Sequence, residues 1–313
     1  MLTFIIRRLL STVLVMAIVA VFIFLLLHLS PGDPAAIIVG DNATQVQIDA
    51  VRKQLGLDDP LAVQFVRWMA GVFRGDLGTS IFSHEPVGKL IAQRIEPTLS
   101  LATTTLLLAV VVAVSLGVLA AWKVGTWVDR VVMVLTVVSF SVPVFVVGYL
   151  FIYLFSIKLG WLPVQGYAPI GEGLVPWISH LVLPSVALGL AYVALIARIT
   201  RTTMLDVLSE DYIRTARAKG VATCPILMKH ALKNAGAPIV TVIGIGVALL
   251  IGGVVITETV FNIPGVGRLV VDAISQRDYP IIQGVTLIFS GVYVMVNLIV
   301  DLSYTVLDPR IRY

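Results

Sequence analysis

Six long stretches without a charged residue limit what this chain can fold into. They cover residues 9–32, 97–122, 131–157, 173–197, 234–257 and 279–300, and each is 22 to 27 residues long. A bilayer core about 30 Å thick is crossed by roughly 20 apolar residues of α-helix, so each stretch is long enough to span a membrane. Six of them in 313 residues argue against a soluble protein with buried helices. We predict an all-α, polytopic membrane protein with six transmembrane helices.

The composition agrees with that prediction, because 58% of the residues are hydrophobic and the mean hydropathy is +0.99. Arg7 and Arg8 precede the first apolar stretch, as in a signal peptide, but no small-x-small cleavage site precedes the following "SPGDP". The first stretch is therefore predicted to be a retained helix. The single cysteine, Cys224, excludes an internal disulfide framework.

The distribution of Lys and Arg predicts the orientation. If the N-terminus is inside, the cytoplasmic segments 1–8, 123–130, 198–233 and 301–313 hold 13 Lys and Arg residues, and the short external loops hold three. Short cytoplasmic loops carry an excess of Lys and Arg. We therefore expect both termini to be cytoplasmic.

Two parts are predicted along the chain. Residues 1–97 contain the first transmembrane helix and a large periplasmic segment, and residues 98–313 contain a five-helix core with a cytoplasmic loop at 198–233. The periplasmic segment is predicted to hold a helix near 45–55, capped by Asn42 or Thr44 and ended by Gly56.

A second external helix is expected to be capped by Asp59, with Pro60 in its first turn, and Pro86 opens a third. The apolar residues of the second helix recur at helical spacing, so it either packs onto the spans or docks another protein. Within the third span, which we place at about 131–155, Pro143 predicts a kink that is either structural or lines a pathway.

The spans offer little chemistry of their own. His28, His180 and Glu258, all near span ends, are the His, Asp, Glu, Lys or Arg residues that we place within them. Ion-driven transporters usually keep buried acids or bases as relays, so their scarcity argues against such a transporter. The sequence "HEPVG" at 84–88 lacks the second histidine of a zinc motif, and no G-x-x-x-x-G-K-[ST] loop for ATP occurs. We predict no catalytic residue, no metal site and no cofactor on this chain; if transport is driven by ATP, the ATPase is another chain.

The stretch "EDYIRTARAKG" at 210–220 is unusual because five of its eleven residues are charged. Ser209 is a candidate N-cap, Glu210 and Asp211 begin the helix, and Gly220 can take the left-handed conformation that ends it. Acidic residues in the first turn and basic residues in the last turn interact favourably with the helix dipole, and a glycine after the last turn ends the helix. The stretch predicts a short helix outside the membrane, which is a solvated face, a lipid-surface helix or a docking site for a partner.

Several ordered motifs resemble one family. "RRLL" precedes the first span, "PGDP" follows it at 31–34, and "GDLGTS" occupies 75–80. "EDYIRTARAKG" is followed by "HALKNA", "TETVFNIPGVGRL" at 257–269, "RDYP" at 277–280 and "DPRIR" near the end. Over essentially the whole chain this order resembles the inner-membrane permease subunits of ABC importers for dipeptides, oligopeptides, nickel and glutathione, and most closely the dipeptide-permease B-type subunit.

That resemblance implies a type I ABC importer permease fold and a helix that couples the permease to an ATPase. The general motif of such a helix is E-A-A-x-x-x-G. With the glycine at Gly220, Arg214, Thr215 and Ala216 lie on E-A-A, so only Ala216 and Gly220 match. This departure leaves the individual ATPase contacts open.

The predicted function is therefore that of a permease subunit in the bacterial inner membrane, importing peptides or related small cargo by alternating access. The implied partners are a second homologous permease, two ATPase subunits, a periplasmic substrate-binding protein and membrane lipid, with no nucleic acid. The alternatives are a stand-alone secondary transporter or channel, and an intramembrane enzyme. Dipeptide, oligopeptide, glutathione, nickel chelate, haem and opine-like cargo all stay open.

Two groups of site residues follow from these predictions. The coupling-helix residues are Glu210, Asp211, Tyr212, Arg214, Thr215, Ala216, Arg217, Lys219 and Gly220. The residues predicted to form a periplasmic gate or to contact the binding protein are Phe261, Pro264, Gly265, Arg268 and Asp278.

Overall fold

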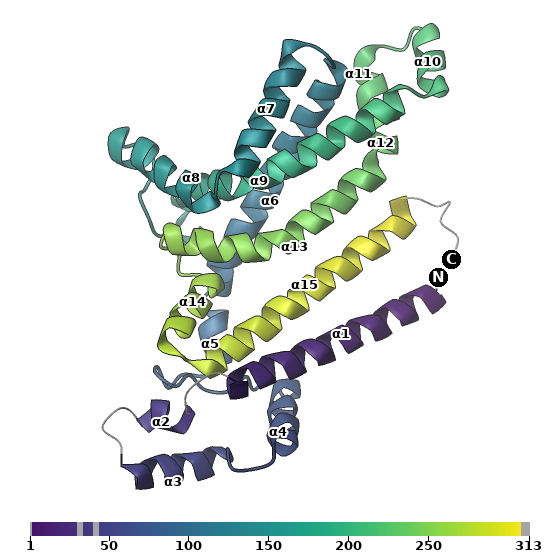
Figure 1. The fold of residues 1–313 in the computed structure, drawn as a ribbon. Coiled ribbons are helices and arrows are strands. Elements are labelled where there is room, and N and C mark those ends of the chain that lie inside the picture. The colour runs from purple at the N-terminus through teal and green to yellow at the C-terminus, as the bar shows by residue number, and fades with distance from the viewer. Residues whose placement is uncertain (1, 30–33, 40–43, 308–313) are drawn as a thin grey trace. The chain divides into compact units, whose positions relative to one another are not determined.

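The computed structural model describes residues 2–29, 34–39 and 44–307, and these residues are helical almost throughout, with no β-strand among them (Figure 1). The predicted all-α class is confirmed. The chain divides into two compact units. One comprises Met1–Ile95 and Leu269–Val294, and the other comprises Glu96–Arg268 and Met295–Tyr313.

The first unit contains α1 (Leu2–Leu29), α2 (Pro34–Val39), α3 (Gln45–Leu55), α4 (Leu61–Phe73), α5 (Val87–Ala92), most of α14 (Val266–Gln276) and much of α15 (Tyr279–Leu307). The cap of α3 is confirmed. The side chain of Thr44 accepts from the backbone of Gln47, the Gln47 side chain accepts from the backbone of Thr44, and Gly56 ends the helix at φ 66°. Asn42, the other predicted cap, lies outside the described residues.

The predicted cap of α4 is wrong. Pro60 is the N-cap residue, and Asp59 instead accepts a hydrogen bond of 2.6 Å from Arg67. The extended backbone of Pro60 starts the helix one residue later than predicted, so Asp59 lies too far back to reach its first free N–H groups. As predicted, α5 begins directly after Pro86.

The apolar side of α4 packs within this unit against α1. The buried Phe24 ring of α1 lies 5.3 Å from Phe65 and 6.0 Å from Trp68, centroid to centroid. Met69 and Val72, one and two turns further, lie against the small cluster of Ala20, Ile23 and Leu287. Most of the apolar residues found at helical spacing in the sequence are therefore occupied by packing.

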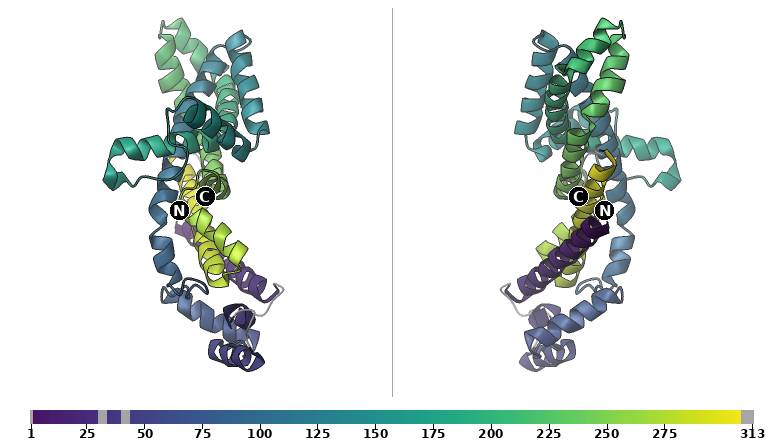
Figure 2. Two further views of the ribbon diagram at one scale, coloured as in Figure 1. Left: turned by 90° about the vertical axis from the view of Figure 1, so that its left-hand side faces the viewer. Right: turned by 90° about the vertical axis from the view of Figure 1, so that its right-hand side faces the viewer.

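The second unit is built around α9 (Leu174–Leu208), which packs against α7 (Trp127–Ser141), α8 (Val144–Phe151) and α13 (Gly236–Val260) (Figures 1 and 2). It also contains α6 (Ile95–Trp122), η1 (Ile152–Lys158), η2 (Ile170–Glu172), α10 (Asp211–Ala218), α11 (Thr223–Pro225), η3 (Ile226–Ala231) and α12 (Leu232–Asn234). The Gly-rich α13 packs closely on α9 at Gly253, where an added Cβ would lie 2.6 Å from the Leu188 side chain.

Within the part of the chain that the structure describes, four helices are long and apolar enough to cross a membrane: Ile95–Trp122, Leu174–Leu208, Gly236–Val260 and Tyr279–Val300. The pair Trp127–Ser141 and Val144–Lys158 makes a fifth if it counts as one span. The first predicted span lies in α1, whose apolar stretch Leu10–Leu25 is shorter than these, so the sixth crossing stays a prediction.

The third predicted span is not one kinked helix. Its two halves are bent by 102° at Val142 and Pro143. Proline has no N–H to continue the helix and disfavours helical backbone at the residue before it, and Val142 is accordingly extended at φ −94° and ψ 124°. The Pro143 carbonyl then accepts from Val146 and Val147 and starts α8. Ser141 donates to the Val137 carbonyl one turn back, inside its own helix.

Candidate functional site

The charged stretch of the sequence forms α10 between α9 and η3. Because α9 continues to Leu208, well beyond the predicted span end, only Ser209 and Glu210 separate the two helices. The prediction that Ser209 caps α10 is wrong. Ser209 ends α9 in helical conformation and donates to the Asp206 carbonyl at 2.7 Å, and the N-cap residue of α10 is Glu210, without a side-chain cap.

The other end of α10 behaves as predicted. Gly220 lies at φ +78°, in the left-handed region that glycine enters without a steric cost. The N–H of Gly220 donates to the Arg217 carbonyl at 2.9 Å, and that of Val221 donates to the Ala216 carbonyl at 3.1 Å. The helix therefore ends with its last carbonyls satisfied.

One buried side chain fixes α10 to the rest of its unit. Ile213 is fully buried where α10 packs against η3. On the same helix, the Tyr212 hydroxyl accepts a hydrogen bond of 2.7 Å from the Asn234 side chain of α12. The segment from η3 through α12 leads directly into α13, so α10 is attached to α9 on one side and to the start of α13 on the other.

The remaining side chains of α10 face outward. Glu210, Asp211, Arg214, Thr215, Arg217 and Lys219 are exposed, and Ala216 is half-buried. On this face an ion pair of 3.3 Å joins Arg214 to Asp211; both side chains are strongly exposed, and such pairs contribute little to stability. The charged groups are therefore available for contacts outside the chain.

An ion pair that the sequence gave no reason to single out joins α9 to the start of α7. The Arg201 guanidinium donates two hydrogen bonds to the Asp129 carboxylate, at 2.6 and 2.8 Å, and the Asp129 side chain is only 7% exposed. The Gly125 N–H donates to the same carboxylate at 3.0 Å. Bidentate, partly buried pairs hold fixed geometry, so the loop 123–126 is joined firmly to α9.

A groove lies where α10 meets the ends of α6 and α9. Its volume is about 580 Å³, and its lining residues come from three segments: Ala121, Trp122, Val124, Leu205, Leu208, Ser209, Arg217, Val221, Thr223, Ile226 and Leu227. Of these, only Arg217 carries a charge. The groove therefore offers an apolar wall with one cationic side chain beside α10.

The predicted gate segment forms a closed turn around the fully buried Glu258 of α13, which we call the Glu258 turn (residues 258–268). The Glu258 carboxylate accepts from the Thr98 hydroxyl at 2.6 Å and from the Arg268 N–H at 2.9 Å. The Thr98 oxygen accepts in turn from the Val266 N–H at 2.8 Å. These bonds join α6, α13 and the first turn of α14.

Gly265 is required for this close approach, since an added Cβ would lie 2.0 Å from a Glu258 carboxylate oxygen. Phe261 is buried and its carbonyl accepts from the Gly166 N–H at 2.9 Å, whereas Pro264 is exposed. The Arg268 guanidinium donates to the Asn262 side chain. The structure thus brings together four of the five predicted gate residues.

Next to this turn, the loop 159–169 carries a polar cluster. The Tyr167 hydroxyl donates to Glu96 at 3.0 Å and shares a hydrogen bond of 3.0 Å with Ser100, which accepts from the Trp177 indole at 3.2 Å. Burial raises the pKa of the Tyr167 phenol, so this side chain is a neutral donor at physiological pH.

Asp278, the fifth predicted gate residue, lies in the other unit. It is 1% exposed at the start of α15 and accepts from the Ser80 hydroxyl at 2.5 Å and from the Phe82 N–H at 3.5 Å. It therefore joins the sequence blocks "GDLGTS" and "RDYP", which lie far apart along the chain. Among the described residues, no group of three or more His, Cys, Asp or Glu side chains is placed to hold a metal ion.

Sequence reasoning missed several residues that organise these sites. Ile213, Asn234, Thr98, Ser80 and the Asp129–Arg201 pair gave no signal, because each acts through a contact in space. Glu258 did give one, as the acid lying within a predicted span, where a charge is costly and is usually kept for a function.

With several helices long and apolar enough to cross a membrane and a separate charged helix, the described part of the chain has the architecture of a multi-pass membrane protein. Residues 113–313 match the family described as "Binding-protein-dependent transport system inner membrane component", and residues 1–102 match its N-terminal counterpart. The chain belongs to this family.

Named relatives cover its whole length. The chain is 59% identical to the probable peptide ABC transporter permease protein y4tP of Sinorhizobium fredii, over 99% of both chains. It is 46% identical to the glutathione transport system permease protein GsiC of Salmonella paratyphi A and 45% identical to GsiC of Escherichia coli K12, over the full length of each.

The fold also resembles a chain of the inward-facing MetNI methionine ABC transporter, with a TM-score of 0.57 at 17% identity, over 70% of this chain and 96% of that one. The protein is thus a non-catalytic permease subunit of an ABC importer and a multi-pass protein of the inner membrane. Nucleotide binding lies on separate ATPase subunits, and the family implies an ATPase and a substrate-binding partner. The stand-alone transporter or channel is not favoured.

Proposed function

We propose that this permease imports peptides or glutathione-like cargo, with both termini in the cytoplasm and α10 as its coupling helix. It would pair with a second, homologous permease above two ATPase subunits, which bind ATP and Mg²⁺, and would receive cargo from a periplasmic binding protein. Residues 1–97 would supply the first span and a periplasmic segment, and residues 98–313 the transport core. The observation that supports the coupling role is that α10 is attached to both α9 and the start of α13.

An isolated helix of 8 residues is too short to be stable in water, where about 12–15 residues are marginal. The buried Ile213 holds α10 in place, the left-handed Gly220 ends the helix, and the charged side chains stay exposed on its surface. The helix α10 is attached to α9 and to the start of α13, and these two helices pack against each other. A displacement of α10 is therefore transmitted to both helices. These properties suit a helix that transmits movement from an ATPase to the spans.

Contacts with the ATPase would be made by the exposed residues of α10. Charge-assisted hydrogen bonds from Glu210, Arg214 and Arg217 can fix the register of docking. The smaller Thr215 and Ala216 permit a close approach. The remaining residues assigned to the coupling helix are Asp211, Tyr212, Lys219 and Gly220.

The Glu258 turn is our proposal for the periplasmic gate or for a contact of the binding protein. Pro264 is exposed and Arg268 is partly exposed, so both can reach a partner, while Phe261 and Gly265 are buried within the turn. Asp278 would act separately, by holding the loop 75–86 on the start of α15. The exposed surfaces of α3 and α4 are a further candidate contact for the binding protein.

The proposed cargo rests on the relatives, one of which is named for peptide transport and two for glutathione transport. The test is to reconstitute the chain with its partner subunits in liposomes and to measure uptake of a labelled dipeptide and of labelled glutathione with ATP inside. ATP-dependent uptake of either supports the proposal. Uptake of neither, by vesicles that hydrolyse ATP, would contradict the cargo assignment.

The coupling role is tested by Arg214→Glu, which reverses an exposed charge on α10. We expect the variant to retain less ATPase subunit on purification while binding-protein docking is kept. Lys53→Glu makes the same charge reversal on the exposed α3 and is the matched control, expected to leave ATPase assembly intact. Equal ATPase recovery from the Arg214 variant and the wild type would count against the assignment.

A further inference from the structure

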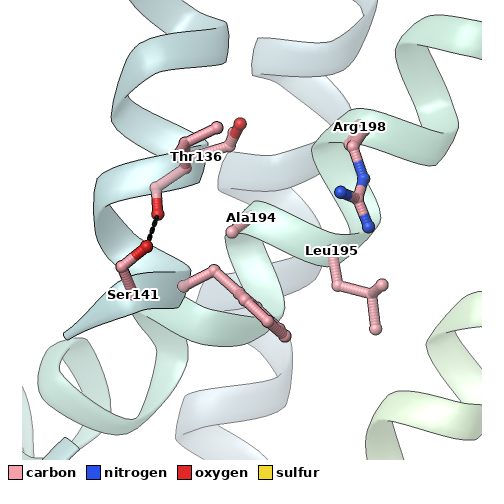
Figure 3. A pocket seen from close by; sticks show the side chains of 7 residues that line it. Thr136, Ser141, Ala194, Leu195 and Arg198 are labelled. Atoms are coloured by element: carbon pink, nitrogen blue, oxygen red, sulfur yellow. Dashed lines mark hydrogen bonds between the residues drawn. The ribbon is translucent and has the colours of Figure 1, made fainter. Parts of the chain in front are cut away.

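A small cavity lies between α7 and α9 in the second unit. Its volume is about 120 Å³, and its lining residues are Thr136, Val137, Phe140, Ser141, Ala194, Leu195 and Arg198. Figure 3 shows the Arg198 side chain running from α9 toward Leu195, with Thr136 and Ser141 across from it on α7. The cavity adjoins the end of α7, directly before the Pro143 break.

Arg198 is the charged residue of this lining, and it has no ion-pair partner among the residues that the structure describes. Its neighbour Arg201, three residues further along α9, is neutralised by Asp129. Both arginines lie in α9 directly beyond the uncharged stretch 173–197, where the predicted cytoplasmic segment begins, and the Arg198 side chain is exposed. Because its guanidinium is exposed and has no carboxylate beside it among the described residues, Arg198 is open to an anionic group.

The remaining polar groups of the lining indicate the kind of ligand. The Thr136 hydroxyl donates to the Met133 carbonyl at 2.7 Å, and the Ser141 hydroxyl donates to the Val137 carbonyl at 2.8 Å. Their protons are used within α7, so the donors left for a guest are those of the Arg198 guanidinium. A guanidinium presents several N–H donors and a positive charge, so in a cavity with apolar walls it binds an oxyanion. Its planar shape allows two parallel hydrogen bonds to a carboxylate.

We propose that this cavity is a subsite for a carboxylate group of the cargo, with Arg198 as the residue that binds it. The inference rests on the proposed peptide-type cargo, which always carries such a group. Sites for whole drug-sized ligands occupy about 300–1,000 Å³, so a cavity of this size takes the anionic end of the cargo and not the entire molecule. Arg198 thereby becomes a specificity-determining residue for import.

A phospholipid phosphate offers the same oxyanion chemistry, and the experiment separates the two sources. The complete transporter is reconstituted in zwitterionic and in anionic lipid, and uptake is measured for a dipeptide and for its C-terminal amide. The variants are Arg198→Gln and Arg198→Lys. Arg130→Gln, at an exposed position of α7 outside the cavity lining, is the matched control.

For each cargo, uptake by a variant is divided by uptake by the wild type, so the selectivity of the binding protein cancels. We expect Arg198→Gln to lower import of the free acid about tenfold or more and import of the amide by less than about twofold, because a hydrogen-bonded charge is lost only for the acid. Arg198→Lys should fall between Arg198→Gln and the wild type. Equal losses for acid and amide, or losses that follow the anionic lipid content, would overturn the proposal.

A second measurement does not depend on delivery of the amide. In a Cys224→Ser background, Arg198→Cys is labelled with a negatively charged thiol reagent during ATP turnover, with and without the free-acid dipeptide. Slower labelling in the presence of the dipeptide is expected, and unchanged labelling would overturn the proposal. If the wild type imports no peptide at all, the proposed cargo fails; if it does and Arg198 shows no selective effect, only the subsite fails.

Discussion

Replacement of Ile213 by alanine tests how α10 is held, and its effect can be estimated from the structure. The side chain is fully buried against η3 and is the main apolar anchor of an 8-residue helix. Truncation of a buried Ile to Ala costs about 2–5 kcal/mol. The remaining Tyr212–Asn234 hydrogen bond contributes only about 0.5–1.5 kcal/mol. At tenfold for each 1.4 kcal/mol, the undocked population of α10 should rise at least about 30-fold.

The assay is amide hydrogen exchange of the assembled transporter, combined with ATP hydrolysis stimulated by the loaded binding protein. Exchange should quicken within residues 211–221 and stay unchanged in the centre of α9. Basal hydrolysis should persist, and its stimulation by cargo should fall. Ile213→Val is the matched control, with an expected cost of about 0.5–1.5 kcal/mol and a correspondingly small effect. Full stimulation of a variant whose α10 exchanges quickly would refute the idea that a docked α10 transmits the signal.

Two further substitutions act on the backbone turns of the proposed coupling and gate segments. Gly220→Val places a β-branched residue at φ +78°, where a left-handed conformation costs about 1–2 kcal/mol, although the added Cβ meets no neighbour. Uptake and cargo-coupled ATP hydrolysis should fall while membrane insertion, measured by fractionation, stays normal; normal uptake would contradict this. Gly265→Ala pushes a Cβ against the Glu258 carboxylate, and each charged hydrogen bond lost there costs about 1.5–3 kcal/mol, so the thermal unfolding midpoint in detergent should drop. Gly252→Ala, in the open on α13, should leave that midpoint in place, and equal midpoints for the two variants would contradict the role of the Glu258 turn.

Much of the fold was predictable because its cause is local in the sequence. Uncharged stretches of the right length predict spans, and a cap at Asn42 or Thr44, together with Gly56, predicts the limits of α3. The bend of 102° at Pro143 was not predictable in size. Proline removes one hydrogen bond and disfavours helix before it, but the packing of α8 against α9 and α13 then decides the angle.

The same distinction applies to the candidate sites. Charge and a terminal glycine predicted α10, and Gly220 has the expected conformation. Its anchor, Ile213, was not predictable, because one isoleucine in a charged stretch gives no sign of what covers it. The approach of Gly265 to Glu258 and the bond from Ser80 to Asp278 join residues that only the folded chain brings together.

Site-specific cross-linking tests the proposed coupling role of α10 most directly. In a Cys224→Ser background, Thr215→Cys on the exposed face of α10 is treated with a short thiol cross-linker in the assembled transporter, and Lys53→Cys on α3 is the control. A cross-link from position 215 to the ATPase subunit, and none from position 53, is the expected result. Absence of any cross-link from position 215, or a cross-link to the ATPase from position 53 instead, would contradict the assignment of α10 as the coupling helix.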